Sequence, residues 1–171
     1  MHMIKVMDVP FGKFRDKSVP IDNYSNFDSA TERVVGVYAL SDILEEKLLF
    51  ATKTGMVKIV AGAEFDVAKK TIASTKLAED DEVIGVFRLE KSEFTVLQSK
   101  AGYFIKLALS DIPEMKKTAV GNHGIKLGAK DEIEAAYVFN KETSPTITYK
   151  EKEMVLSNLK VSVRNSKGTK K

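Results

Sequence analysis

Short apolar runs alternate with polar turns along the whole chain, and one pattern returns after about fifty residues. Residues 48–60 read LLFATKTGMVKIV, and residues 95–107 read TVLQSKAGYFIKL. Each segment has an apolar run, a hydroxyl residue, a lysine, a variable residue and a glycine, followed by a second apolar run that contains a lysine. Because self-similarity at a fixed spacing is the signature of repeat architectures, the pattern predicts a repeat protein.

Two further motifs recur at the same spacing. A β-branched run that ends near an aromatic residue begins at Glu32 (ERVVGVYAL), at Asp81 (DEVIGVFRL) and at Asp131 (DEIEAAYVF), with starts 49 and 50 residues apart. An apolar-Lys-apolar triplet occupies residues 4–6, 57–59 and 105–107. Runs of this composition are typical of buried strands, so each motif predicts one strand per repeat.

Each unit is therefore predicted to contain a strand, a Lys-x-Gly turn, a strand, a basic loop, a strand, an acidic turn and a strand. Gly55 and Gly102 suit such turns because glycine accepts a positive φ angle. Residues 41–47 are predicted to be a loop between units with room for one helical turn. Short strands with frequent turns predict an all-β fold, and four strands in about fifty residues is the size of a propeller blade.

The spacing predicts one repeat domain over residues 1–171, with about three blades of four short antiparallel strands and a partial blade. The units run over residues 4–47, 48–93 and 94–145, and the partial unit over residues 146–171. The chain opens inside one unit and closes inside another, so we expect it to be a fragment of a longer array. Ring closure and the total number of blades stay open, because closed propellers usually have at least four blades.

Composition narrows the class of protein. With 43% hydrophobic and 30% charged residues and a net charge of +3, the chain can build a core and is not a disordered polycation. It has no cysteine, which excludes disulfides and thiolate metal sites. We find no apolar run near eighteen residues and no signal peptide, and therefore expect a soluble intracellular chain.

Cations gather in the segment between the second and third strands of each unit. Neighbouring blades place equivalent loops side by side, so this repetition predicts a continuous basic rim that binds phosphates. The principal candidates are Lys69, Lys70, Lys116 and Lys117, followed by Arg15, Lys17, Lys76 and Lys126, with Arg164 and Lys167 in the basic tail. Lysines in turns also serve solubility and protect strand edges, so a protein-interaction propeller without a nucleic-acid role remains the alternative.

Catalytic motifs are missing from the pattern. His2 and His123 have no partner at metal or triad spacing, and the GNHG segment lacks the Gly-Lys-Ser/Thr of a phosphate-binding loop. The carboxylate pairs at residues 80–81 and 131–132 are predicted to be exposed turn residues with ordinary pKa values. We therefore expect no catalytic residue, no metal site and no cofactor.

The segments ATKTGMVKIV, EDDEVIGVF, QSKAGYFIKL and NHGIKLGAKDEI resemble the C-terminal repeats of bacterial type IIA topoisomerase A subunits, in gyrase and topoisomerase IV. The resemblance extends over residues 4–127 and, more weakly, to residue 171. It implies a β-pinwheel, a propeller-like disc whose blades exchange strands with their neighbours. It also implies a basic rim that binds and bends duplex DNA without reading its sequence.

Two departures from that family matter. Gyrase A subunits carry a glutamine- and arginine-rich box with a Gly-Gly pair, and the nearest segment here, RNSKGTKK, lacks these features. This difference favours the topoisomerase IV type but leaves the choice, and the handedness of any wrapping, open. The family's nucleophilic tyrosine lies in a separate domain, and no tyrosine here has its setting, at positions Tyr24, Tyr38, Tyr103, Tyr137 and Tyr149.

The resemblance thus implies a DNA-holding part without the chemistry. Its partners would be duplex DNA and, in the full ATP-dependent enzyme, the ATPase B subunit with a second A subunit, but no membrane. Its place would be the bacterial cytoplasm, in association with the nucleoid. The oligomeric state is not determined by the sequence.

Overall fold

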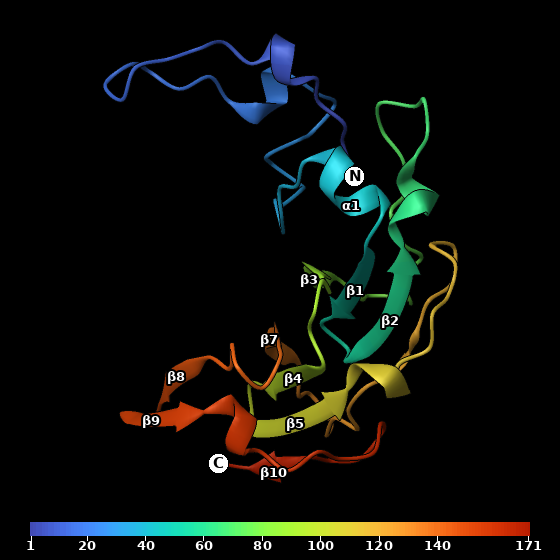
Figure 1. Ribbon diagram of the computed structural model, residues 1–171, viewed down its shortest axis with the longest axis vertical. Helices are drawn as coiled ribbons and strands as arrows, with labels where there is room; N and C mark the ends of the chain where they lie inside the picture. Colours follow the sequence, from blue (N-terminus) through green and yellow to red (C-terminus); the bar gives the residue numbers. More distant parts are fainter.

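The computed structural model describes all 171 residues, Met1 to Lys171, as an arc of small antiparallel sheets (Figure 1). Helix is confined to the five-residue α1 (Leu40–Leu44) and to short 3-10 turns. These turns are η1 (Val6–Asp8), η2 (Ile21–Asn23), η3 (Gly62–Phe65), η4 (Leu109–Asp111) and η5 (Leu156–Asn158). The predicted all-β class is confirmed, and so is the helical turn before the first hairpin.

Two complete blades and one further hairpin make up the arc. The first blade has the order β3-β1-β2-β6, with β1 (Lys47–Thr52), β2 (Met56–Ala61), β3 (Val83–Arg88) and β6 (Asn122–His123). The second blade has the order β10-β5-β4-β7, with β4 (Phe94–Ser99), β5 (Tyr103–Ala108), β7 (Ile133–Phe139) and β10 (Thr169–Lys170). The hairpin consists of β8 (Thr146–Tyr149) and β9 (Lys152–Val155).

In each blade, the edge strand that pairs with the second hairpin strand comes from the following unit. Strand β6 follows β5 in the chain, yet it pairs with β2 of the first blade, where Met56 faces His123. In the same way β10 follows the third hairpin and pairs with β5, where Phe104 faces Thr169. This is the strand exchange that the family resemblance implies.

The two hairpins repeat each other in detail. Gly55 and Gly102 have φ angles of 85° and 83°, so both Lys-x-Gly turns use the conformation predicted for their glycines. The pairing of β1 with β3 shifts register next to Thr52, and the pairing of β4 with β7 shifts next to Ser99. Equivalent positions therefore carry equivalent bulges, which confirms the repeat in three dimensions.

Strands predicted in the first unit are not formed. Residues 4–6 and the run that begins at Glu32 contain no strand, and His2 makes only a single bridge to Thr71. In the complete blades the corresponding run pairs with the first strand of an upstream hairpin, as Phe87 does with Leu49. The present chain offers residues 34–40 no such strand, and without hydrogen-bonding partners a strand does not form.

Alternation along the hairpin strands buries both faces of each blade. Leu49 and Val57 pack with Leu97 and Ile105 into a twelve-residue core between the two blades. The opposite face of the first blade packs around Phe50, Phe65 and α1, and that of the second blade around Phe104 and Phe139, against the third hairpin. Stacked faces of this kind explain why the blades stabilise one another.

Gly62 offers a test of this packing. A Cβ atom at Gly62 would lie 1.5 Å from the carbonyl oxygen of Ile43, and the Gly62 N–H donates to the carbonyl of Glu46 at 2.7 Å. We expect Gly62→Ala to lower the free energy of unfolding by about 1–3 kcal/mol, since α1 must move. Urea denaturation measures this. Gly128→Ala is the control, because nothing lies within 4 Å of a Cβ there; equal effects would contradict the packing account.

Candidate nucleic-acid interface

Three segments follow the second strands of the hairpins along the convex edge of the arc: residues 67–76, 114–126 and 160–171 (green, orange and red in Figure 1). We call this edge the outer rim. The backbone N–H of Lys76 donates to the carbonyl of Lys117 at 3.2 Å, and that of Lys126 donates to the carbonyl of Ser166 at 2.9 Å. These bonds hold the three segments side by side, as the repeat predicts.

Eight of the ten cations predicted from the sequence lie on the outer rim. They are Lys69, Lys70, Lys76, Lys116, Lys117, Lys126, Arg164 and Lys167. Six are exposed, and only Lys117 and Arg164 are half-buried. None of the eight forms an ion pair with a carboxylate of the protein. The rim therefore presents unneutralised positive charge to solvent.

Lys117 differs from the other rim lysines because its ammonium has internal partners. It donates to the carbonyl of Glu64, and its nitrogen lies 5.8 Å from the centroid of the Phe65 ring. Its backbone N–H donates to the Glu64 carboxylate at 2.8 Å. Lys117 thus fastens the rim to η3, and its neighbour Lys116 is the residue of the pair that is free to meet a ligand.

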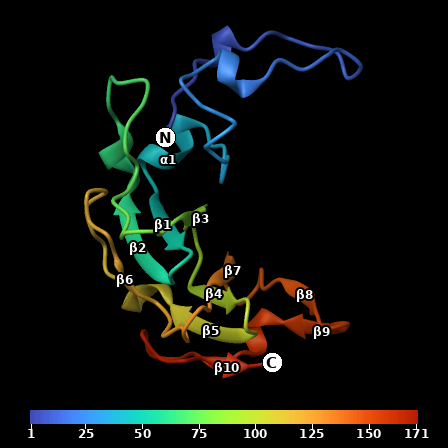
Figure 2. The same ribbon diagram turned by 180° about the vertical axis from the view of Figure 1, so that it is seen from behind.

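Arg15 and Lys17 are not brought to the outer rim. Both residues are exposed, and residues 11–20, which contain them, form a loop that extends away from residues 67–76 in both ribbon views (Figures 1 and 2). Residues 114–126 and 160–171 are held by pairing with the second strand of the preceding hairpin, and residues 70–72 are held by backbone bonds to residues 1–3. The segment of Arg15 and Lys17 has no such pairing in this structure, and the rim forms without these two residues.

The recurring lysine of the apolar-Lys-apolar motif is buried inside the blades. Lys58 is 1% exposed, and its ammonium donates to the carbonyl of Lys117 at 2.9 Å and to those of Lys116 and Ala119. Lys106 is 6% exposed and donates to the carbonyl of Ser157 at 2.8 Å. Burial lowers the pKa of both, and the Glu64 carboxylate opposes this for Lys58. The apolar residues on both sides of each lysine are the signal in the sequence for this buried role.

The acidic turns bind the Lys-x-Gly turns. Asp81 accepts from the Thr54 N–H at 2.9 Å and from its hydroxyl at 2.6 Å, and Asp131 accepts from the Ala101 N–H at 2.9 Å. The ordinary pKa predicted for Asp81 is wrong. Burial raises the pKa, but hydrogen bonds from Thr54, Thr52 and two backbone N–H groups outweigh burial and lower it.

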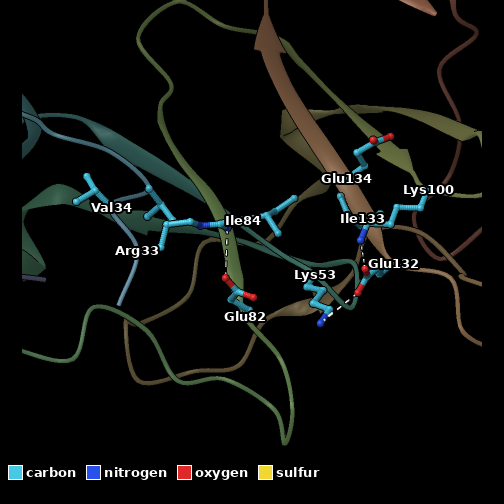
Figure 3. A pocket seen from close by; sticks show the side chains of 10 residues that line it. Arg33, Val34, Lys53, Glu82, Ile84, Lys100, Glu132, Ile133 and Glu134 are labelled. Atoms are coloured by element: carbon cyan, nitrogen blue, oxygen red, sulfur yellow. Dashed lines mark hydrogen bonds and ion pairs between the residues drawn. The ribbon is translucent and has the colours of Figure 1, made fainter. Parts of the chain in front are cut away.

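A cavity of about 420 Å³ lies on the concave side, between β3, β7 and residues 33–35 (Figure 3). Glu132 accepts from Lys100 and, at 3.2 Å, from Lys53, while Arg33 pairs with Glu82 at 3.3 Å. The pKa of Glu132 is lowered by Lys100 and then by Lys53, so its ordinary pKa was also a wrong prediction. Each cation in the cavity has a carboxylate partner, in contrast to the outer rim.

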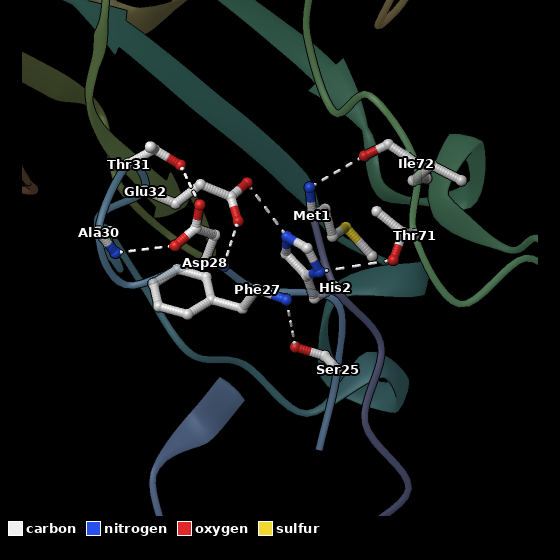
Figure 4. A network of polar contacts seen from close by, with 10 residues as sticks. All are labelled: Met1, His2, Ser25, Phe27, Asp28, Ala30, Thr31, Glu32, Thr71 and Ile72. Carbon is white, nitrogen blue, oxygen red and sulfur yellow. Dashed lines mark hydrogen bonds and ion pairs between the residues drawn. The ribbon is translucent and has the colours of Figure 1, made fainter. Parts of the chain in front are cut away.

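His2 joins the N-terminal segment to the rim (Figure 4). One ring nitrogen lies 3.3 Å from a Glu32 oxygen and the other 3.4 Å from the Thr71 hydroxyl. The pKa of Glu32 is lowered by the Asp28 N–H and then by His2. These contacts give His2 a structural role. No group of histidine, aspartate or glutamate side chains is arranged to hold a metal ion, and no helix has the length and apolarity needed to cross a membrane.

The family model described as DNA gyrase C-terminal domain, beta-propeller, matches residues 46–90 and 94–140. These two segments contain the hairpins and inner strands of the two complete blades, and together they make up more than half of the chain. The chain belongs to the DNA gyrase C-terminal domain family. The resemblance seen in the repeats is therefore confirmed, and with it the pinwheel fold of this gyrase-type domain.

Individual relatives agree with this membership. The DNA gyrase A protein of Lawsonia intracellularis is 31% identical over 169 residues, which are 97% of this chain and 20% of that protein. The corresponding gyrase protein of Klebsiella oxytoca is 30% identical over 135 residues, 78% of this chain and 15% of that protein. The solved C-terminal domain of DNA topoisomerase IV superposes with a TM-score of 0.67 at 22% identity, over 74% of this chain and 41% of that one, and shares the fold. The chain thus spans a fifth or less of the length of these two gyrase relatives.

Asp81→Asn tests the link between the acidic turn and the hairpin. Because the folded pKa lies below the ordinary value of 3.8, the stabilisation is fully present above that value and is lost as the pH falls through the folded pKa. We expect the variant to lower the free energy of unfolding by about 1–2 kcal/mol at neutral pH. This deficit should shrink below about pH 4.

Thermal unfolding from pH 7 to pH 3 measures both effects. Asp80→Asn removes the same charge from the neighbouring residue, whose side chain accepts no hydrogen bond and whose backbone has a φ of 58° that asparagine tolerates. A deficit for Asp81→Asn that is equal to that of Asp80→Asn, or independent of pH, would refute the role assigned to the carboxylate.

Proposed function

We propose that this chain binds duplex DNA through the outer rim, without reading its sequence, as the DNA-holding part of a type II topoisomerase A subunit. The observation that carries the proposal is that three basic segments lie side by side along one edge. They contain eight cations that have no carboxylate partner. Membership of the gyrase C-terminal domain family supports it. Contacts of this kind fix DNA by its phosphates and carry no base information.

The shape of the rim supports bending as well as binding. A duplex that follows a convex basic edge must curve, and bending a site of 20–30 base pairs costs of the order of 1–6 kcal/mol. Each additional phosphate contact offsets part of that cost by releasing counterions. Rim cations spread over three segments are therefore better suited to holding a curved duplex than the same charges in one cluster would be.

The remaining parts of the proposal follow from this role. The chain supplies DNA positioning and no catalytic residue or cofactor, while strand cleavage belongs to another domain. Its protein partners are the ATPase B subunit together with a second A subunit, in the bacterial cytoplasm at the nucleoid. Residues 1–171 act as one repeat domain that belongs to a longer protein.

A protein-interaction role is the second candidate, and the N-terminal segment favours it. Phe11 is 97% exposed and Met7 94% exposed, and Phe14 is also fully accessible. Apolar side chains of this size are typical of interface centres, where salt has little effect on affinity. Salt dependence therefore separates the two candidates, because phosphate contacts weaken steeply with salt.

Charge reversal on the rim tests the proposed function. Fluorescence anisotropy with a labelled duplex of about 40 base pairs and arbitrary sequence is measured at about 50 mM and 200 mM salt. We expect micromolar or tighter binding at the lower salt concentration. At the higher concentration the affinity should fall by at least about tenfold. Replacing Lys69, Lys70 and Lys116 by glutamate should weaken binding about tenfold or more and reduce its salt dependence.

The matched control replaces Lys13, Arg15 and Lys17 by glutamate, which makes the same change in net charge away from the rim. Equal losses in the two triple variants would show that net charge alone drives binding and would overturn the rim assignment. Absence of duplex binding by the unmodified chain at the lower salt would overturn the DNA role and favour the protein-interaction candidate.

A further inference from the structure

The Lys58 ammonium lies directly beneath one loop of the outer rim. Its three acceptors are the carbonyl oxygens of Lys116, Lys117 and Ala119, so three peptide groups within four residues turn their oxygens toward one buried charge. A buried ammonium is costly unless it is hydrogen-bonded, and these carbonyls satisfy all three of its donors. The loop and the lysine therefore fix each other.

This arrangement determines where two backbone N–H groups point. In a trans peptide the N–H of one residue is directed opposite to the carbonyl of the residue before it, and the chain has no cis peptide. Because the carbonyls of Lys117 and Ala119 face the buried ammonium, the N–H groups of Thr118 and Val120 face away from it, toward the rim surface.

These two N–H groups have no acceptor within the protein. Two other donors of the loop are used, since the N–H of Lys117 binds the Glu64 carboxylate and the N–H of Ala119 binds the carbonyl of Lys116. Thr118 is exposed and Val120 half-buried, and both lie within four residues of the exposed Lys116 in the chain. Free backbone N–H groups that point the same way beside a cation can bind an anion.

We propose that Lys58 is a positioning residue that shapes residues 116–120 into a phosphate-binding loop. One phosphate of the DNA backbone accepts hydrogen bonds from the N–H groups of Thr118 and Val120 and pairs with the Lys116 ammonium. This inference rests on the proposed function. It gives a buried lysine, which never touches DNA, control over one point of contact on the rim.

The equivalent lysine of the second blade provides a matched control. Lys106 occupies the same position in its hairpin and is similarly buried, but its ammonium donates to the single carbonyl of Ser157, within η5. That ammonium donates to none of the rim residues from Arg164 to Lys167. Lys58→Met and Lys106→Met thus remove the same buried charge, and only the first releases a loop that carries rim cations.

Fluorescence anisotropy with the labelled duplex measures the DNA affinity of both variants. Each measurement is made below the melting temperature of the variant. We expect Lys58→Met to weaken binding about tenfold and to reduce the slope of log affinity against log salt by about one, the value for one phosphate contact. Lys106→Met should leave the slope unchanged. Equal changes of slope in the two variants would show a general effect of stability and would overturn the inference.

NMR of the unmodified chain keeps the test independent of how well the variants fold. Amide signals are followed during titration with the duplex and, separately, with inorganic phosphate. We expect the Thr118 and Val120 amides to shift with the duplex. Binding that leaves these two amides unmoved would refute the loop while the proposed function stands. Shifts with phosphate alone, and no duplex binding, would refute the proposed function and reduce the loop to a site for small anions.

Discussion

In both complete blades the second strand of the hairpin pairs with a segment from the next unit, and the shape of the arc depends on that pairing. Strand β6 reaches back to β2, and β10 reaches back to β5. The exchange satisfies backbone groups that would otherwise form an open sheet edge. It also lays residues 114–126 and 160–171 along the outside of the preceding blade, so that this part of the rim is a consequence of completing the sheets.

Charges of the repeat are divided between two sides with different physical roles. On the concave side Lys53 and Lys100 meet Glu132, and Asp81 is held by hydrogen bonds to Thr54, so these groups stabilise turns. On the convex side the cations have no carboxylate partner and remain available to a polyanion. Buried Lys58 belongs to neither set, since its charge serves the shape of the loop above it.

The N-terminal unit shows how far a blade depends on its neighbours. Its sequence carries the same strand motifs as the others, yet residues 34–40 remain unpaired and expose Val37 at 81%. Repeat proteins derive their stability from interfaces between units, and a unit without a first strand has no sheet to extend. The displacement of Arg15 and Lys17 from the rim is a consequence of the same lack.

The sequence by itself determined the spacing of the repeat, the hairpins, the positive φ of Gly55 and Gly102, the all-β class and the loops that carry the rim cations. These features depend on local alternation and on backbone preferences of single residues, which a pattern records directly. Only the tertiary structure decided that Lys58 is buried whereas Lys116 is free, and that the carboxylate of Asp81 caps a distant turn. Those outcomes depend on contacts between residues far apart in the chain, and the burial of a charge is set by what packs around it.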